Sequence, residues 1–154
     1  MEKLTFDLQN HTFEGSSSGP SVVITAGVHG DEQTGIHTAK LVCERLKQSA
    51  VLGKVTILPF CNLEASRARR RQAPQDGLDL NRTFPGKADG SYSEQLAWHI
   101  WQLTDGYDYL LDLHCCGLYG STYGMGFYSR HPWAEELLNA LMLDTVVHTK
   151  GTRG

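Results

Sequence analysis

Cysteine is scarce in this sequence of 154 residues, and the four that occur are scattered. Cys43, Cys61, Cys115 and Cys116 include no Cys-x-x-Cys pair, which argues against a zinc ribbon, a thioredoxin motif or the disulfide framework of a small secreted protein. Cys43 falls in a helix-like stretch and Cys61 at a strand end. Because free cysteine is commonly buried, we expect both to be small core side chains.

The sequence also lacks a long apolar run and a large excess of charge of one sign. The longest apolar run, Val22 to Val28, is strand-sized and far shorter than the ~20 residues of a membrane helix. Residues 1–10 lack the apolar segment of a signal peptide, so a cytoplasmic location is expected. The net charge of −3 gives no reason to expect nucleic acid or a membrane as partner, and the oligomeric state stays unknown.

What is present is typical of a soluble globular domain, with 40% apolar and 20% charged residues. A chain of this length buries roughly 70% of its unfolded surface, which suits one domain with a real core. We find no internal repeat and no low-complexity segment beyond the Ser/Gly-rich loop at 15–20. We therefore treat residues 1–154 as a single α/β domain.

Hydrophobic periodicity predicts strands that alternate with helices. Buried strands are expected at 21–27, 54–60 and 108–113, and helices from Glu32 onward and from the Ser91/Glu94 capping box to Leu103. Weaker patterns predict a strand at 4–8 with a hairpin partner at 11–14, a long loop with one short helix at 62–87, strands at 124–129 and 145–149, and a helix at 132–143. This alternation predicts a mixed, mostly parallel sheet with helices on both faces.

Polar side chains follow the predicted buried strands, where open α/β sheets place their ligand sites. His29 and Glu32, spaced i, i+3, follow the first of these strands, and His114 follows the third. Two histidines and one glutamate match catalytic zinc sites, which leave a fourth position to water. Each residue also has an ordinary explanation, as a hydrogen-bonded strand-end histidine or a first-turn carboxylate. The spacing alone therefore leaves metal-binding and metal-free domains open.

Three motifs occur in a fixed order: GVHGDE, then DGLDLNRTFPG (Asp76 to Gly86), then DLHCCG (Asp112 to Gly117). Together they resemble the succinylglutamate desuccinylase/aspartoacylase family, a branch of the zinc carboxypeptidase superfamily. The match covers roughly Ser21 to Gly154, since VVHTKGTRG at the end is also similar to a family segment. The resemblance implies a zinc carboxypeptidase-like fold with one Zn²⁺ per chain, bound by His29, Glu32 and His114.

The resemblance also implies roles in binding a small-molecule substrate with a free carboxylate. Asn81 and Arg82 match the pair that grips this carboxylate, and Arg71 matches the arginine that polarises the scissile carbonyl. These roles make chemical sense, because a guanidinium forks onto a carboxylate and stabilises a developing oxyanion. The alternative is a solvated basic face, which stays open for the neighbouring arginines, Arg67, Arg69 and Arg70.

Other residues near these motifs have secondary or no assigned roles. Asp31 and Asp112 are plausible carboxylates for the second ring nitrogen of a metal-bound histidine, although solvation or capping explains them equally well. Cys115 and Cys116 stay outside the expected ligand set.

The family mechanism needs a general base, usually a glutamate, beyond the third ligand. Glu135 and Glu136 are the only glutamates after His114, and their context indicates a solvated helix face. We therefore expect the C-terminal part of the family fold, with the base, to be absent from this chain. The expected parent activity is zinc-dependent hydrolysis of an amide bond in an N-acyl amino acid. The alternatives are a zinc carboxypeptidase acting on short peptides, a zinc-binding module without hydrolysis, and a metal-free domain.

Overall fold

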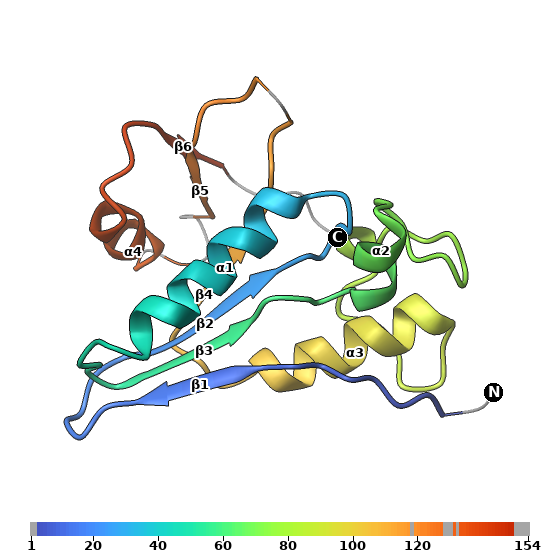
Figure 1. Cartoon of the computed structure of the whole chain (residues 1–154), viewed down its shortest axis with the longest axis horizontal. Coiled ribbons are helices and arrows are strands. Elements are labelled where there is room, and N and C mark those ends of the chain that lie inside the picture. Colours follow the sequence, from blue (N-terminus) through green and yellow to red (C-terminus); the bar gives the residue numbers. More distant parts are fainter. Residues whose placement is uncertain (1–2, 118, 128–130, 132, 150–154) are drawn as a thin grey trace. The chain divides into compact units, whose positions relative to one another are not determined.

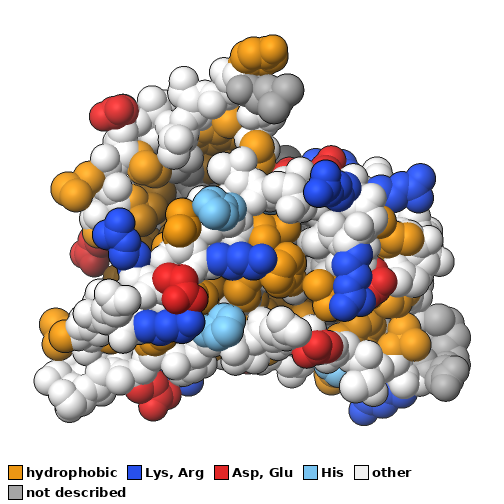
Figure 2. All heavy atoms as spheres, in the orientation of Figure 1, with side chains coloured by type: hydrophobic (Ala, Val, Ile, Leu, Met, Phe, Trp, Pro, Cys, Tyr) orange, Lys and Arg blue, Asp and Glu red, His pale blue; other side chains and the backbone are white. Residues whose placement is uncertain are grey.

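The computed structural model describes residues 3–117, 119–127, 131 and 133–149. The chain divides into two compact units, Met1–Cys115 and Cys116–Gly154. No helix in the described part of the chain is long and apolar enough to cross a membrane. On the face drawn in Figure 2, acidic and basic side chains are interspersed, and neither sign forms a continuous patch.

A four-stranded sheet forms the frame of the first unit (Figure 1). Its strands are β1 (His11–Glu14), β2 (Ser21–Ala26), β3 (Lys54–Leu58) and β4 (Tyr109–Leu113), in the order β1-β3-β2-β4. β2 runs parallel to both β3 and β4, whereas β1 is antiparallel to β3. The sheet is therefore mixed and mostly parallel, and the carboxyl ends of its three parallel strands lie at one edge, as expected from the sequence.

Helices cover both faces of this sheet. Successive residues of a strand point to opposite faces, and the two apolar clusters of the unit follow this rule. Ile24 of β2 packs with Ala39 of α1 (Gln33–Leu46), while its neighbour Val23 packs with Leu96 of α3 (Tyr92–Thr104). Two short helices, α2 (Leu63–Ala68) and η1 (Leu80–Arg82), lie in the long segment between β3 and α3. The predicted fold class is confirmed.

Two local predictions from the sequence are confirmed, the capping box of α3 and the burial of two cysteines. The Ser91 hydroxyl accepts from the Glu94 backbone N–H (3.4 Å), and the Glu94 carboxylate accepts from the Ser91 N–H (2.8 Å), so the capping box that opens α3 is present. Cys43 and Cys61 are both buried, with exposed fractions of 4% and 1%. Both cysteines are thus core side chains, as predicted.

Four local predictions are wrong. Residues 4–8 form no strand. The backbone N–H of Leu4 donates to the side chain of Gln95 in α3 (2.9 Å), and Phe6 packs against the apolar cluster that contains Leu96. β1 consequently pairs with β3 and not with residues 4–8. The segment 62–87 contains two short helices instead of one. β4 is only partly buried, since within the described sheet it pairs on one side alone and Leu110 is 52% exposed.

The second unit contains a small two-stranded sheet and one helix. β5 (Gly124–Gly126) and β6 (Val146–His148) pair in parallel, and α4 (Ala134–Ala140) connects them. Gly124 faces the side chain of Leu138, where a Cβ would come within 2.5 Å of a methyl carbon. Parts of the strand predicted at 124–129 and of the helix predicted at 132–143 lie outside the described residues.

Candidate metal centre

The loop between β2 and α1 holds His29 in a fixed place because it packs backbone to backbone against α2. The N–H of Gly30 donates to the carbonyl of Arg70 (2.9 Å). A Cβ on Gly30 would lie 2.1 Å from the carbonyl oxygen of Ala65, so only glycine allows this approach. Gly27 adopts a φ of 65°, a conformation that glycine reaches without steric cost.

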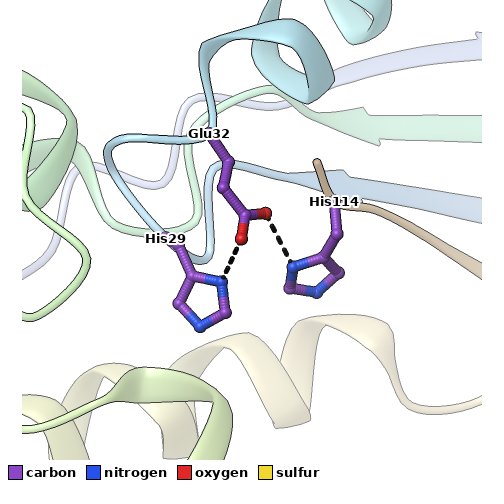
Figure 3. Close-up of side chains that lie close together, drawn as sticks. All are labelled: His29, Glu32 and His114. Atoms are coloured by element: carbon purple, nitrogen blue, oxygen red, sulfur yellow. Dashed lines mark hydrogen bonds and ion pairs between the residues drawn. The ribbon is translucent and has the colours of Figure 1, made fainter. Parts of the chain in front are cut away.

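The three predicted ligands meet at the carboxyl ends of β2 and β4 (Figure 3). One carboxylate oxygen of Glu32 lies 2.8 Å from Nδ1 of His29, and its other oxygen lies 2.8 Å from Nδ1 of His114. One ligand atom from each residue falls within 4.8 Å of the others. We refer to these residues as the His-Glu-His cluster. The parallel register of β2 and β4 explains how side chains 82 positions apart come together.

Two aspartates orient the imidazole rings from the far side. Nε2 of His29 lies 3.0 Å from Asp79, and Nε2 of His114 lies 2.6 Å from Asp112. A metal bound at the cluster would take the lone pair of each Nδ1, so in that state each Nε2 is the protonated nitrogen and donates to its aspartate. Asp112 also accepts from the hydroxyl of Thr25 (2.8 Å), which holds its carboxylate in place.

The charges of the cluster favour a cation. The hydrogen bond to Asp112 raises the pKa of His114 to about 9 against the opposing effect of burial, and the charges of Asp112 and Glu32 add to the rise. Burial pushes the pKa of Asp79 upward, but the hydrogen bond and charge of His29, with contributions from Asn81 and Arg71, leave this pKa below its usual value. Without a metal, the protonated imidazole of His114 supplies positive charge that Asp112 and Glu32 attract.

The donor set fits zinc. Two imidazole nitrogens and one carboxylate are the ligands of many catalytic zinc sites, and the aspartates supply the supporting hydrogen bonds that such histidines usually have. Exposure rises across the cluster, from 2% for His29 to 14% for Glu32 and 31% for His114. The cluster is thus anchored in the core at His29 and reachable from solvent at His114.

The structure brings Arg71 to the cluster. Its Nε donates to Oδ2 of Asp79 (3.1 Å), and its Nη2 forms an ion pair with the same oxygen (3.0 Å). Its Nη1 lies 3.7 Å from Oε1 of Glu32. Asn81 and Arg82 lie in η1, whose first turn is capped by Asp79, and both are exposed. The guanidinium of Arg82 donates to the carbonyl of Asn81 (3.2 Å) and takes part in no ion pair within the described residues.

Three other residues near the motifs contribute no side-chain hydrogen bond to the two imidazoles. Asp31 is exposed and hydrogen-bonds to neither imidazole. Arg67 pairs with Glu64 on the exposed face of α2 (2.6 Å), in agreement with a solvated role. Cys115 contributes its backbone N–H, which donates to Oε2 of Glu32 (3.0 Å).

Asp79 is the residue that the sequence reasoning missed. It stands in the DLNR motif beside the two residues assigned to substrate binding, and it caps the helical turn that carries them. Its contact with His29 spans 50 positions, which no local pattern in the sequence reveals. Its place within a recognised motif was the one available signal.

The mixed sheet covered by helices, with the His-Glu-His cluster at its carboxyl edge, makes this an α/β protein with a candidate metal centre. Residues 18–154 match the model of the succinylglutamate desuccinylase/aspartoacylase catalytic domain, and the chain belongs to this family. The resemblance carried by the three sequence motifs is thereby confirmed.

The relatives are longer than this chain. It is 43% identical over 100 residues to N-α-acetyl-L-2,4-diaminobutyric acid deacetylase of Halomonas elongata, which covers 64% of the chain and 29% of that protein. An aspartoacylase family protein of Mesorhizobium loti has a TM-score of 0.78 at 30% identity, covering 90% of the chain and 46% of that structure. A succinylglutamate desuccinylase/aspartoacylase of Rhodobacter sphaeroides has a TM-score of 0.62 at 35% identity, covering 70% of the chain and 33% of that structure. The chain thus spans less than half of each relative.

Proposed function

We propose that this chain carries the zinc-binding part of an amide hydrolase that removes the acyl group from an N-acyl amino acid. One observation carries the proposal: the Glu32 carboxylate lies between Nδ1 of His29 and Nδ1 of His114, at 2.8 Å from each. The deacetylase from Halomonas elongata, by its name, acts on an N-acetylated amino acid, which supports this substrate class.

Each residue near the cluster has a definite task in the proposal. Zinc, when bound, supplies a Lewis acid that polarises the scissile carbonyl and acidifies a water molecule. Arg71 points Nη1 toward the cluster and donates to the carbonyl oxygen as negative charge develops there. Arg82, with Asn81, grips the free carboxylate through its exposed guanidinium. Asp79 and Asp112 keep the two imidazoles in the tautomer that binds metal.

Metal content tests the first step. Untagged protein purified without chelator is loaded with zinc, desalted and analysed by mass spectrometry for bound metal. We expect one equivalent per chain. Less than about 0.2 equivalents would reject the zinc centre, because structural and catalytic zinc sites bind the ion tightly enough to keep it through desalting.

Turnover tests the second step, with the complete protein that contains this sequence. We expect release of acetate or succinate from N-acetyl- or N-succinyl-amino acids. Cleavage of dipeptides instead would identify a carboxypeptidase acting on short peptides. Stoichiometric zinc with no turnover of either substrate class would reject hydrolysis and leave a zinc-binding module.

A further inference from the structure

Asp79 joins groups that belong to different parts of the proposed site. Its Oδ1 accepts from Nε2 of His29 (3.0 Å) and from the backbone N–H of Asn81 (2.9 Å). Its Oδ2 accepts from Nε of Arg71 (3.1 Å) and forms an ion pair with Nη2 of the same guanidinium (3.0 Å). The carboxylate is only 19% exposed, so water competes weakly for these contacts.

This arrangement limits what Arg71 can do. A guanidinium offers two edges for paired hydrogen bonds, and Asp79 occupies the edge formed by Nε and Nη2. The remaining group, Nη1, lies 3.7 Å from Oε1 of Glu32 and so faces the His-Glu-His cluster. Arg82 differs, because within the described residues its guanidinium meets only a backbone carbonyl. Arg71 is therefore restricted in orientation, and Arg82 keeps a whole edge for a ligand.

We propose that Asp79 is a positioning residue that holds Arg71 with Nη1 directed at the cluster while the same carboxylate fixes the ring of His29. One side chain then fixes the orientation of both a metal ligand, His29, and the group that contacts the substrate carbonyl, Arg71. The proposal rests on the proposed function for the zinc ion and for the substrate carbonyl. The link between Asp79 and Arg71 is measurable without turnover.

Asp112 provides a matched control. It accepts from Nε2 of His114 (2.6 Å), as Asp79 does from His29, but it makes no contact with Arg71. Asp79→Asn and Asp112→Asn should therefore both weaken zinc binding, by about 10–100-fold, as expected for the loss of a carboxylate behind a metal-bound histidine. Only Asp79→Asn should change the freedom of Arg71.

Site-resolved chemical modification measures that freedom in the metal-free chain. The probe is phenylglyoxal, which modifies guanidinium groups, and fragment-ion mass spectrometry follows Arg71 with Arg82 as the reference in the same sample. In the unaltered chain Arg71 should react more slowly than Arg82. Asp79→Asn should raise the Arg71 rate by about tenfold, and Asp112→Asn should leave it unchanged within about twofold. An unchanged rate in Asp79→Asn, or an equal rise in both variants, would overturn the proposal.

Replacing Arg71 by lysine tests the contact with Asp79 from the arginine side and keeps the positive charge. Lysine lacks the fork that holds Asp79, so Arg71→Lys should weaken zinc binding several-fold, whereas Arg82→Lys should leave it unchanged. If Asp79→Asn does not fold, the two lysine variants still test whether Asp79 couples Arg71 to His29. Equal zinc affinities of the two lysine variants would contradict a carboxylate that couples Arg71 to His29. A failure to hydrolyse any amide would leave these results intact and reject only the proposed function.

Discussion

Glu32 illustrates how a single residue can be tested against an adjacent one. Both of its carboxylate oxygens face imidazole nitrogens, whereas the neighbouring Asp31 is exposed. We predict that Glu32→Ala lowers zinc affinity by at least about a hundredfold, since one of the three proposed protein ligands is lost. Asp31→Ala removes the same charge one position away and should change zinc affinity by less than about threefold. Competition with a chromophoric chelator measures both, and similar losses would show that Glu32 acts through charge alone.

Gly30 is the residue whose replacement should be least tolerated in the loop. A Cβ there would lie 2.0 Å from the carbonyl carbon of Ala65, and a backbone atom cannot move aside as a flexible side chain does. Gly30→Ala should therefore destabilise the fold by about 2–4 kcal/mol and reduce zinc binding as His29 shifts. Gly106→Ala is the control, because Gly106 has open space around it and only its φ of 81° is unfavourable, a cost of about 1–2 kcal/mol. Urea denaturation compares the two, and equal losses would contradict the steric explanation.

The sequence predicted some of these residues and missed others for a physical reason. His29, Glu32 and His114 follow apolar strands, so the rule for ligand sites in α/β sheets predicted them at one edge of the sheet. That rule left a metal-free domain open, and the ligand set was predicted from the family motifs. Asp79 sits in a segment without periodicity, and its contact with His29 depends on how that segment folds back. Long-range contacts made by loops leave no periodic trace in a sequence.

At the scale of elements, α3 depends on its first turn. The capping box satisfies two backbone donors that the helix itself leaves without partners. Ser91→Ala should destabilise the protein by about 0.5–2 kcal/mol. Thr38→Ala, which removes an exposed hydroxyl from the middle of α1, should cost less than about 0.5 kcal/mol. Thermal melts monitored by circular dichroism compare the two, and a loss at Ser91 no larger than that at Thr38 would argue against the cap.

Element prediction worked where the pattern and the end signals agreed. α3 has both an apolar face and a capping box, and it forms where predicted. Residues 4–8 have alternation alone, and alternation also suits an extended segment that turns one face to a helix. A strand needs a partner in a sheet, and the local sequence does not reveal whether one is available.

At the scale of the whole molecule, Asp76 ties the motif loop to α3 and makes stability depend on pH. Burial raises its pKa, but hydrogen bonds from the backbones of Ser93 and Leu78 and from the Ser93 hydroxyl outweigh burial, so the pKa lies below its usual value. The folded state thus favours the carboxylate. This stabilisation is complete above the unfolded pKa of about 3.9 and is lost as the pH falls through the folded pKa.

Asp76→Asn should accordingly be less stable than the unaltered chain by about 1–3 kcal/mol at pH 7. The difference should shrink below about pH 4, where the unaltered chain protonates Asp76 and loses the same contribution. Urea denaturation at a series of pH values measures the free energy of unfolding of both chains. A difference that stays constant from neutral to strongly acidic pH would refute the carboxylate as its source.

Zinc bound at the proposed centre should stabilise the whole first unit, because the His-Glu-His cluster joins the β2–α1 loop to the end of β4. A ligand that binds only the folded state, present at a hundred times its Kd, adds about 2.7 kcal/mol, which for a chain of this size raises Tm by roughly 5–11 °C. His114→Ala should abolish this shift, and His37→Ala, which removes an exposed histidine from α1, should retain it. Calorimetric scans with zinc and with chelator measure the shift. His114 is the residue of the cluster that lies at the end of β4, so a zinc ion at the cluster cannot link the two strand ends without it. An equal zinc-dependent rise of Tm in both variants would therefore show that zinc binds elsewhere, for example at a cysteine.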